Sequence, residues 1–274
     1  MSTTKPAIAG VKHIIAVASG KGGVGKSTTA VNLALALKEN GARVGILDAD
    51  IYGPSIPQML GVANVRPEIV EQKSVKPIVG LGVQSISMGY LVTEKTPMVW
   101  RGPMASGALI QLLTTTLWDN LDYLIIDMPP GTGDIQLTLS QKVPVSGAVI
   151  VTTPQDIALL DAQKGIEMFR KVNVPVLGVV ENMATHTCSN CGHEEHVFGA
   201  GGGERIALDY QTQLLGSLPL SLNIRQDADA GKPTVAVDAD SDISLIYRDI
   251  ARKLVAAVDH SGAPVMPEIL VSDD

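Results

Sequence analysis

Residues 19–28 read Ser19-Gly20-Lys21-Gly22-Gly23-Val24-Gly25-Lys26-Ser27-Thr28. The run before them, Ile14-Ile15-Ala16-Val17-Ala18, is apolar without alternation, which is typical of a parallel strand buried on both faces. After them, apolar residues recur at helical spacing until Asn40-Gly41, which is a helix stop signal. A glycine-rich loop with the spacing G-x-x-x-x-G-K-[ST] between a strand and a helix is the P-loop arrangement. We therefore expect a phosphate-binding site here.

The residue types of this loop indicate how a nucleoside triphosphate would bind. Glycine accepts backbone angles that a Cβ forbids, so successive N–H groups can point at a polyphosphate, and the helix N-terminus adds partial positive charge. Lys26 is expected to reach the β- and γ-phosphates of ATP, and the Ser27 hydroxyl to ligate Mg²⁺. The nucleotide-binding residues predicted for the loop are Gly20, Lys21, Gly22, Gly23, Val24, Gly25, Lys26, Ser27 and Thr28.

Lys21 is a second lysine near the start of the loop, and a simple P-loop does not need it. With this lysine, the run from Gly20 to Thr28 resembles the deviant Walker A motif of the MinD/ParA/nitrogenase-iron-protein group of P-loop ATPases. In that group the early lysine reaches across a dimer to the partner's nucleotide. The resemblance therefore implies a catalytic role for Lys21, beside Lys26, and a nucleotide-sandwich homodimer. From the residues alone, a solvated loop lysine is the alternative.

Composition and charge narrow the class of protein. The chain has 274 residues, of which 3% are aromatic, and its many aliphatic residues suit a parallel sheet covered by helices. The net charge of −7 disfavours non-specific binding to nucleic acid. No stretch approaches the ~18 uninterrupted apolar residues of a membrane span, and the polar start lacks the apolar core of a signal peptide. We expect a cytoplasmic protein with neither a membrane nor a nucleic-acid partner.

Strand and helix patterns alternate along the rest of the chain. Strands are expected at 43–50, 83–88, 123–127, 148–152, 176–180 and 214–218, and helices near 55–60, 103–117, 156–171, 224 and 242–258, with an irregular connection at 64–80. Right-handed crossovers then give an α/β fold, a doubly wound and mainly parallel sheet with helices on both faces. We expect one P-loop ATPase domain, residues 11–260, between a flexible N-terminus (1–10) and a flexible tail (261–274).

One aspartate follows an apolar strand in the manner of a Walker B motif. Asp127 ends the run Tyr123-Leu124-Ile125-Ile126, and a carboxylate at that place holds Mg²⁺ or its water shell. The next segment, Pro129-Pro130-Gly131-Thr132-Gly133, resembles switch II of the same group, whose backbone senses the γ-phosphate.

Three further polar residues receive roles from the resemblance. Asp50 matches the switch I aspartate that orients the attacking water and is therefore expected to be catalytic. Asp48 is expected in the outer shell of Mg²⁺, and Asn182 matches the asparagine that reads adenine. From the residues alone, Asp48 could equally cap a turn or helix, and Asn182 could cap backbone groups in a turn.

Cys188 and Cys191 are the two cysteines of the sequence, so a disulfide framework is excluded. A two-residue spacer lets both thiolates bind one metal. Two thiolates do not complete a [4Fe–4S] cluster, but a symmetric dimer brings a second pair to the same axis. The alternatives are zinc held together with His193 or His196, and a thiol–disulfide pair.

The Cys-x-x-Cys insertion, at about 184–198, follows Val180-Glu181-Asn182-Met183. Its place resembles the iron–sulfur carrier branch called Mrp or ApbC, and the resemblance covers nearly the whole chain. It implies an ATP-hydrolysing carrier that assembles a [4Fe–4S] cluster at a homodimer interface and transfers it to apo iron–sulfur proteins. An empty thiolate pair is also expected to capture zinc during purification.

The sequence leaves two other functions as alternatives to the carrier. One is a MinD/ParA-like positioning ATPase that binds membrane or DNA and holds zinc on its cysteine pair. That role needs a basic amphipathic C-terminal helix or a basic face, whereas the tail here is acidic. An electron-donating reductase like the nitrogenase iron protein has its bridging cysteines on separate segments, unlike Cys188 and Cys191.

Overall fold

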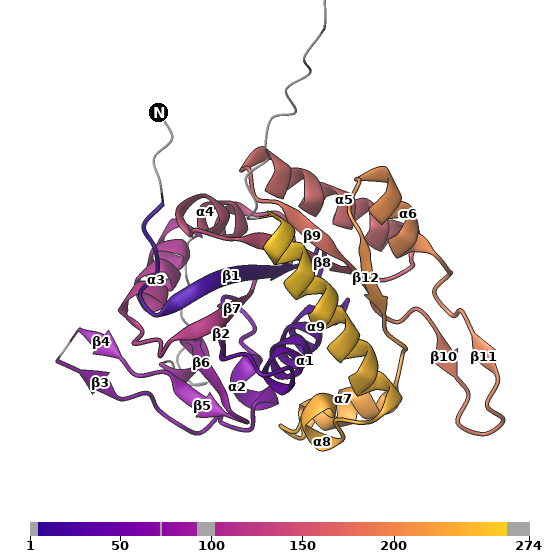
Figure 1. The fold of residues 1–274 in the computed structure, drawn as a ribbon, viewed down its shortest axis with the longest axis horizontal. Coiled ribbons are helices and arrows are strands. Elements are labelled where there is room, and N and C mark those ends of the chain that lie inside the picture. Colours follow the sequence, from indigo (N-terminus) through magenta and orange to yellow (C-terminus); the bar gives the residue numbers. More distant parts are fainter. Residues whose placement is uncertain (1–4, 72, 92–101, 262–274) are drawn as a thin grey trace, which may run out of the picture.

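The computed structural model describes residues 5–71, 73–91 and 102–261, which form a helix-covered central sheet (Figure 1). The sheet has eight strands in the order β12-β9-β8-β1-β7-β2-β6-β5, and every neighbouring pair is parallel except β5 with β6. Their bounds are β1 Val11–Ala18, β2 Val44–Asp48, β5 Ile78–Gly80, β6 Val83–Ser87, β7 Leu121–Asp127, β8 Gly147–Thr152, β9 Val176–Glu181 and β12 Leu214–Ser217. The expected α/β fold with a mainly parallel sheet is confirmed.

Helices cover both faces of the sheet because the central strands are apolar on both sides. In β1, Ile15 and Val17 pack with α1 (Lys26–Glu39) and α9 (Asp242–Ser261). Ile14 and Ala16 belong to the core on the opposite face. That face is covered by α3 (Gly102–Thr115), α4 (Asp134–Lys142) and α5 (Asp156–Lys171). The shorter helices are α2 (Ile56–Met59), η1 (Met88–Tyr90), α6 (Gly202–Asp209), α7 (Leu222–Asp229) and α8 (Thr234–Val237).

The connection at 64–80, expected to be irregular, contains strand structure, and that expectation was wrong. A small hairpin pairs β3 (Ile69–Val70) with β4 (Ser74–Val75), and β5 then forms the antiparallel edge of the main sheet. The turn from β5 to β6 places Leu81 and Gly82 at φ 52° and 80°. Two-residue hairpins favour asparagine or aspartate before glycine, so a leucine at the first position concealed this turn in the sequence.

The C-terminal helix α9, expected at 242–258, packs into the core. Tyr247, Ile250, Leu254 and Val258 are buried against α1 and β12. Among the described residues, no helix has the length and apolar character needed to cross a membrane.

The described part of the N-terminal segment contacts the domain. Ile8 is buried, and Lys5 Nζ donates a hydrogen bond to the Ser140 carbonyl oxygen at 2.6 Å. Flexible ends were expected at 1–10 and 261–274. Of these, residues 1–4 and 262–274 lie outside the described residues, and Ser261 is the last residue of α9. The domain limits therefore stay predictions.

Candidate functional site

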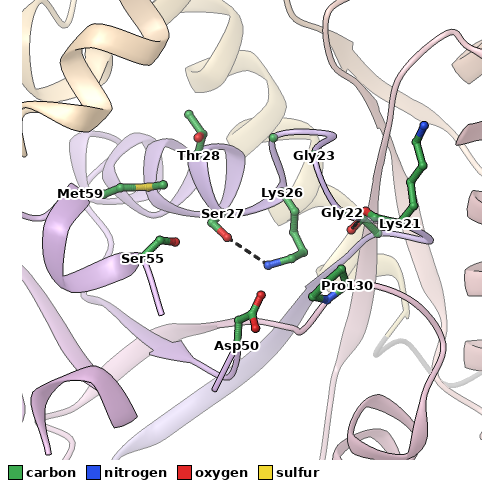
Figure 2. A pocket seen from close by; sticks show the side chains of 12 residues that line it. Lys21, Gly22, Gly23, Lys26, Ser27, Thr28, Asp50, Ser55, Met59 and Pro130 are labelled. Carbon is green, nitrogen blue, oxygen red and sulfur yellow. Dashed lines mark hydrogen bonds between the residues drawn. The ribbon is translucent and has the colours of Figure 1, made fainter. Parts of the chain in front are cut away.

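The glycine-rich loop lies at the carboxyl end of β1 and borders a pocket of about 240 Å³ (Figure 2). Loop residues, the first turn of α1 and Asp50 face one another across it. The pocket is lined by Ser19, Lys21, Gly22, Gly23, Gly25, Lys26, Ser27, Thr28, Asp50, Ser55, Met59 and Pro130. The sequence motifs predicted most of these residues as parts of one nucleotide site. Ser55 and Met59 belong to no motif, so the sequence analysis did not predict their place in the pocket.

The two predicted loop residues that do not line the pocket hold the loop in position. Val24 is buried, with 1% of its side chain exposed. Gly20 lies so close to α5 that a Cβ on it would come within 2.1 Å of the backbone of Asp161. The segment 129–133, which resembles switch II, also contacts the loop, because the Gly131 N–H donates a hydrogen bond to the Ser19 carbonyl at 3.0 Å. The P-loop is therefore packed between α5 and switch II.

Lys26 and Asp127 form a buried ion pair beneath the pocket. Lys26 Nζ lies 2.6 Å from Asp127 Oδ1 and 3.1 Å from Ser27 Oγ, and the two charged side chains are 7% and 0% exposed. Burial raises the pKa of Asp127, and the Lys26 ammonium opposes this increase. Asp127 Oδ2 is buried and has no hydrogen-bond partner among the described residues. A buried carboxylate oxygen without a partner, beside the Ser27 hydroxyl, is a donor set that fits Mg²⁺.

The Asp48 carboxylate is buried and accepts hydrogen bonds from neighbouring residues. Its Oδ2 accepts hydrogen bonds from Ser87 Oγ at 3.0 Å and from the Ile56 N–H at 3.3 Å, and its Oδ1 accepts one from the Asp50 N–H at 3.2 Å. Burial raises the pKa of Asp48 to about 7, and the nearby Asp127 carboxylate adds to the increase. These contacts are those of a residue that caps a turn and a helix start, the second role expected for Asp48. The sequence analysis did not predict the contact of Ser87, which lies at the end of β6, with Asp48.

Asp50 and Lys21 lie on opposite sides of the loop (Figure 2). The Asp50 carboxylate is directed into the pocket, toward the tip of Lys26. The Lys21 side chain is directed away from it, and its Nζ lies 3.5 Å from Gln155 Oε1. Gln155 also accepts a hydrogen bond from Thr153 Oγ1 at 3.3 Å. Gln155 belongs to no motif, so the sequence analysis did not predict it as a site residue. Its place soon after the end of β8, at the carboxyl edge of the sheet, was the one signal for it.

Asn182 contacts the P-loop directly. Its Nδ2 donates to the Val24 carbonyl oxygen at 2.8 Å, and its own N–H donates to the Thr152 carbonyl at 2.7 Å. The contact needs a glycine beside it, because Gly25 has φ 81° and a Cβ there would lie 2.2 Å from Asn182 Nδ2. Adenine recognition by Asn182, expected from the resemblance, stays a prediction.

The Cys-x-x-Cys insertion forms a projecting hairpin, with β10 (His186–Thr187) antiparallel to β11 (Glu194–Glu195) (Figure 1). Both cysteines are free thiols in its turn: Cys191 is exposed and Cys188 is partly exposed. The Cys188 N–H donates to the His193 carbonyl at 2.9 Å. Hydrogen bonds from the backbone N–H groups of Asn190 and Cys191 lower the pKa of the Cys188 thiol, which favours the thiolate that binds metals.

The histidines near the cysteines do not complete a metal site. Within 5–71, 73–91 and 102–261 there is no group of three or more His, Cys, Asp or Glu side chains arranged to hold a metal ion. His196 Nδ1 lies 2.9 Å from the Ala184 carbonyl, and His186 Nδ1 lies 3.3 Å from Glu195 Oε1. The described part of one chain therefore offers a pair of cysteine side chains and no complete coordination shell.

Comparisons with known proteins agree with this site. An iron–sulfur cluster carrier protein of Pseudomonas fragi is 68% identical over 247 residues, which are 90% of this chain and 86% of that protein. The carrier protein of Escherichia coli (strain K12) is 61% identical over 265 residues, 97% of this chain and 72% of that protein. A nucleotide-binding protein from Archaeoglobus fulgidus, solved with ADP, is 36% identical with a TM-score of 0.73, covering 85% of this chain and 90% of that one.

A family model also matches most of the chain, residues 10–255, and its description is ParA, NUBPL iron-transfer P-loop NTPase. The match includes the P-loop, Asp127 and the cysteine hairpin. The resemblance drawn from the Walker A motif and the Cys-x-x-Cys insertion is thus confirmed. This chain belongs to the ParA family of NUBPL-type iron-transfer P-loop NTPases.

Proposed function

We propose that this protein is an ATP-hydrolysing carrier that holds a [4Fe–4S] cluster between two copies of itself and delivers it to apo iron–sulfur proteins. The observation that carries the proposal is the cysteine pair Cys188 and Cys191 on a projecting hairpin, with no further metal ligands grouped around it in the described part of the chain. A [4Fe–4S] cluster takes four thiolates, so two hairpins from a homodimer supply the full set. The similar proteins named as iron–sulfur cluster carriers support this function.

The nucleotide role rests on the pocket at the P-loop. Lys26 is bound to Asp127 in the structure, and the phosphates of ATP would draw its ammonium toward the pocket. Ser27 and Asp127 would then hold Mg²⁺, with Asp48 behind them, and the metal would neutralise phosphate charge. Asp50, whose carboxylate is directed into the pocket, would orient the attacking water, and Lys21, directed away from its own pocket, would reach the partner's nucleotide. We expect this work to take place in the cytoplasm.

The positioning ATPase is not favoured as an alternative. It would bind membrane or DNA through a basic amphipathic C-terminal helix or a basic face. The apolar stripe of α9 is buried against α1 and β12, and the net charge of the chain is −7. In our proposal zinc on the cysteine pair is a substitute for the cluster, captured when the thiolates are without iron.

The test is cluster transfer. The protein is loaded anaerobically with iron and sulfide, and an apo-enzyme that needs a [4Fe–4S] cluster for activity is added with or without Mg·ATP. We expect wild-type protein to restore the activity of the recipient, and the double variant C188S/C191S to restore none while keeping its fold by circular dichroism. The matched control is S217A, a serine at the end of β12 outside the hairpin. Equal transfer by the wild type and C188S/C191S would contradict the proposal.

A further inference from the structure

The nucleotide loop and the cysteine hairpin are joined by one short segment, residues 182–184. At its start the Asn182 side chain donates to the Val24 carbonyl of the P-loop. At its end Ala184 is buried, its N–H donates to the Leu218 carbonyl at 2.9 Å, and its carbonyl contacts His196 Nδ1 at 2.9 Å. His196 directly follows β11 (Glu194–Glu195), the returning strand of the hairpin, and its contact with Ala184 ties that strand to the segment. We propose that Asn182 couples occupancy of the phosphate pocket to the position of the cysteine hairpin, as a positioning residue.

The contact with Val24 acts on a group that faces the phosphates. The Val24 carbonyl and the Gly25 N–H belong to one planar peptide unit, so fixing the direction of the oxygen fixes that of the N–H. Gly25 lines the pocket, and Asn182 holds the opposite end of the unit at 2.8 Å. A phosphate that accepts from the Gly25 N–H polarises the peptide and strengthens the bond from Asn182. The position of Asn182 therefore depends on whether the pocket is filled.

The segment between the two contacts can change its conformation. Met183, between Asn182 and Ala184, has φ 58°, a left-handed conformation that a residue with a side chain rarely adopts. Such a conformation persists only while the surrounding contacts impose it. The Asn182 N–H bond to Thr152 and the Ala184 bonds impose it here. A shift of Asn182 therefore changes the restraint on Met183 and, through Ala184 and His196, the base of the hairpin.

The sequence offers a direct readout of the hairpin. Cys188 and Cys191 are the two cysteines of the whole chain, so the rate of thiol alkylation in the metal-free protein reports on the hairpin alone. The inference rests on the proposed function, because it takes a nucleotide as the ligand of the P-loop. Its readout needs neither a cluster nor ATP hydrolysis, so the two can fail separately.

The experiment compares alkylation rates with and without Mg·ADP, with sedimentation velocity used to match the oligomeric state. In the wild type we expect ADP to change the rate about fivefold or more, the lower end of typical coupling between two sites. In N182A the ratio of the two rates should fall to about one at an ADP concentration that calorimetry shows to saturate the variant, so that a weaker ADP affinity does not affect the comparison. H196A removes the contact between His196 and the Ala184 carbonyl at the hairpin end of the segment. Its ratio of alkylation rates with and without ADP should also fall to about one, with the ADP affinity unchanged. The matched control is N223A, an exposed asparagine on α7, which should behave as the wild type.

A second measurement uses the reciprocity of coupled sites. Zn²⁺ on the cysteine pair must change the ADP affinity of the wild type by the same factor by which ADP changes the Zn²⁺ affinity, and N182A should lose both effects. A wild-type alkylation rate that does not respond to bound ADP would overturn the inference. So would an N182A variant that keeps the full response. Failure of the wild type to bind ADP would overturn the proposed function together with this inference.

Discussion

Removal of the Lys26 ammonium tests the buried ion pair beneath the pocket. In K26M the methionine keeps most of the apolar length of the side chain, but Asp127 loses the partner of its Oδ1 while its Oδ2 already has none in the described structure. Removing one partner of a buried pair typically costs about 3–5 kcal/mol of folding free energy. We expect about 3 kcal/mol for K26M at about pH 8, because protonation of Asp127 limits the penalty.

The direction of the pH dependence follows from Asp127. Burial holds its pKa above that of the unfolded chain, so the folded state binds the proton more tightly and gains stability as the pH falls. Lys26 opposes this increase, so its removal raises the pKa of Asp127 further and makes the folding free energy depend more strongly on pH. The cost of K26M should therefore be smaller at about pH 6 than at about pH 8, and the double variant K26M/D127N should recover part of the loss.

Urea unfolding of the nucleotide-free protein, followed by circular dichroism, measures these differences. The control is K38M, because Lys38 pairs with Glu39 at 3.0 Å on the surface, where such a pair contributes about 0–1 kcal/mol. A cost of K26M below about 1 kcal/mol with no change between the two pH values would refute the buried pair.

Three further substitutions test separate parts of the site. D50N should still bind nucleotide but hydrolyse ATP about a hundredfold more slowly, since an amide orients and activates water poorly; unchanged turnover would remove Asp50 from catalysis. K21A should keep ADP affinity by calorimetry but weaken ATP-dependent dimerisation by sedimentation velocity, because Lys21 is directed away from its own pocket; a loss of ADP binding by the monomer would contradict this role. G25A should lower ADP affinity about tenfold, since a left-handed conformation costs alanine about 1–2 kcal/mol, and equal affinity would show that the loop adapts.

Local patterns predicted the elements of the fold well. The helix expected at 156–171 is α5, Asp156–Lys171, and the runs of branched apolar residues are β1, β7 and β8. These predictions succeeded because a strand covered on both faces and an amphipathic helix each leave a pattern within a few residues. The α6 helix was missed because Gly202 and Gly203 open it, and glycine is a poor helix former.

Contacts between distant residues were beyond the reach of local patterns. The motif located Lys26 and Asp127 separately, but the ion pair between them spans 101 positions. The bond from Asn182 to Val24 spans 158 positions, and it depends on how β9 and the P-loop meet at one edge of the sheet. The resemblance assigned Asn182 to adenine, whereas its position relative to Val24 and to the hairpin could come only from the structure.

The stoichiometry of iron and sulfide in the reconstituted protein tests the central claim most directly. Cys188 and Cys191 give half of the thiolates that a [4Fe–4S] cluster needs, so cluster binding and dimerisation must occur together. Protein loaded anaerobically should carry about two iron and two sulfide per chain, run as a dimer in sedimentation velocity and show the Mössbauer spectrum of a four-iron cluster. About four iron and four sulfide on a monomer, or a cluster retained by C188S/C191S, would contradict the account.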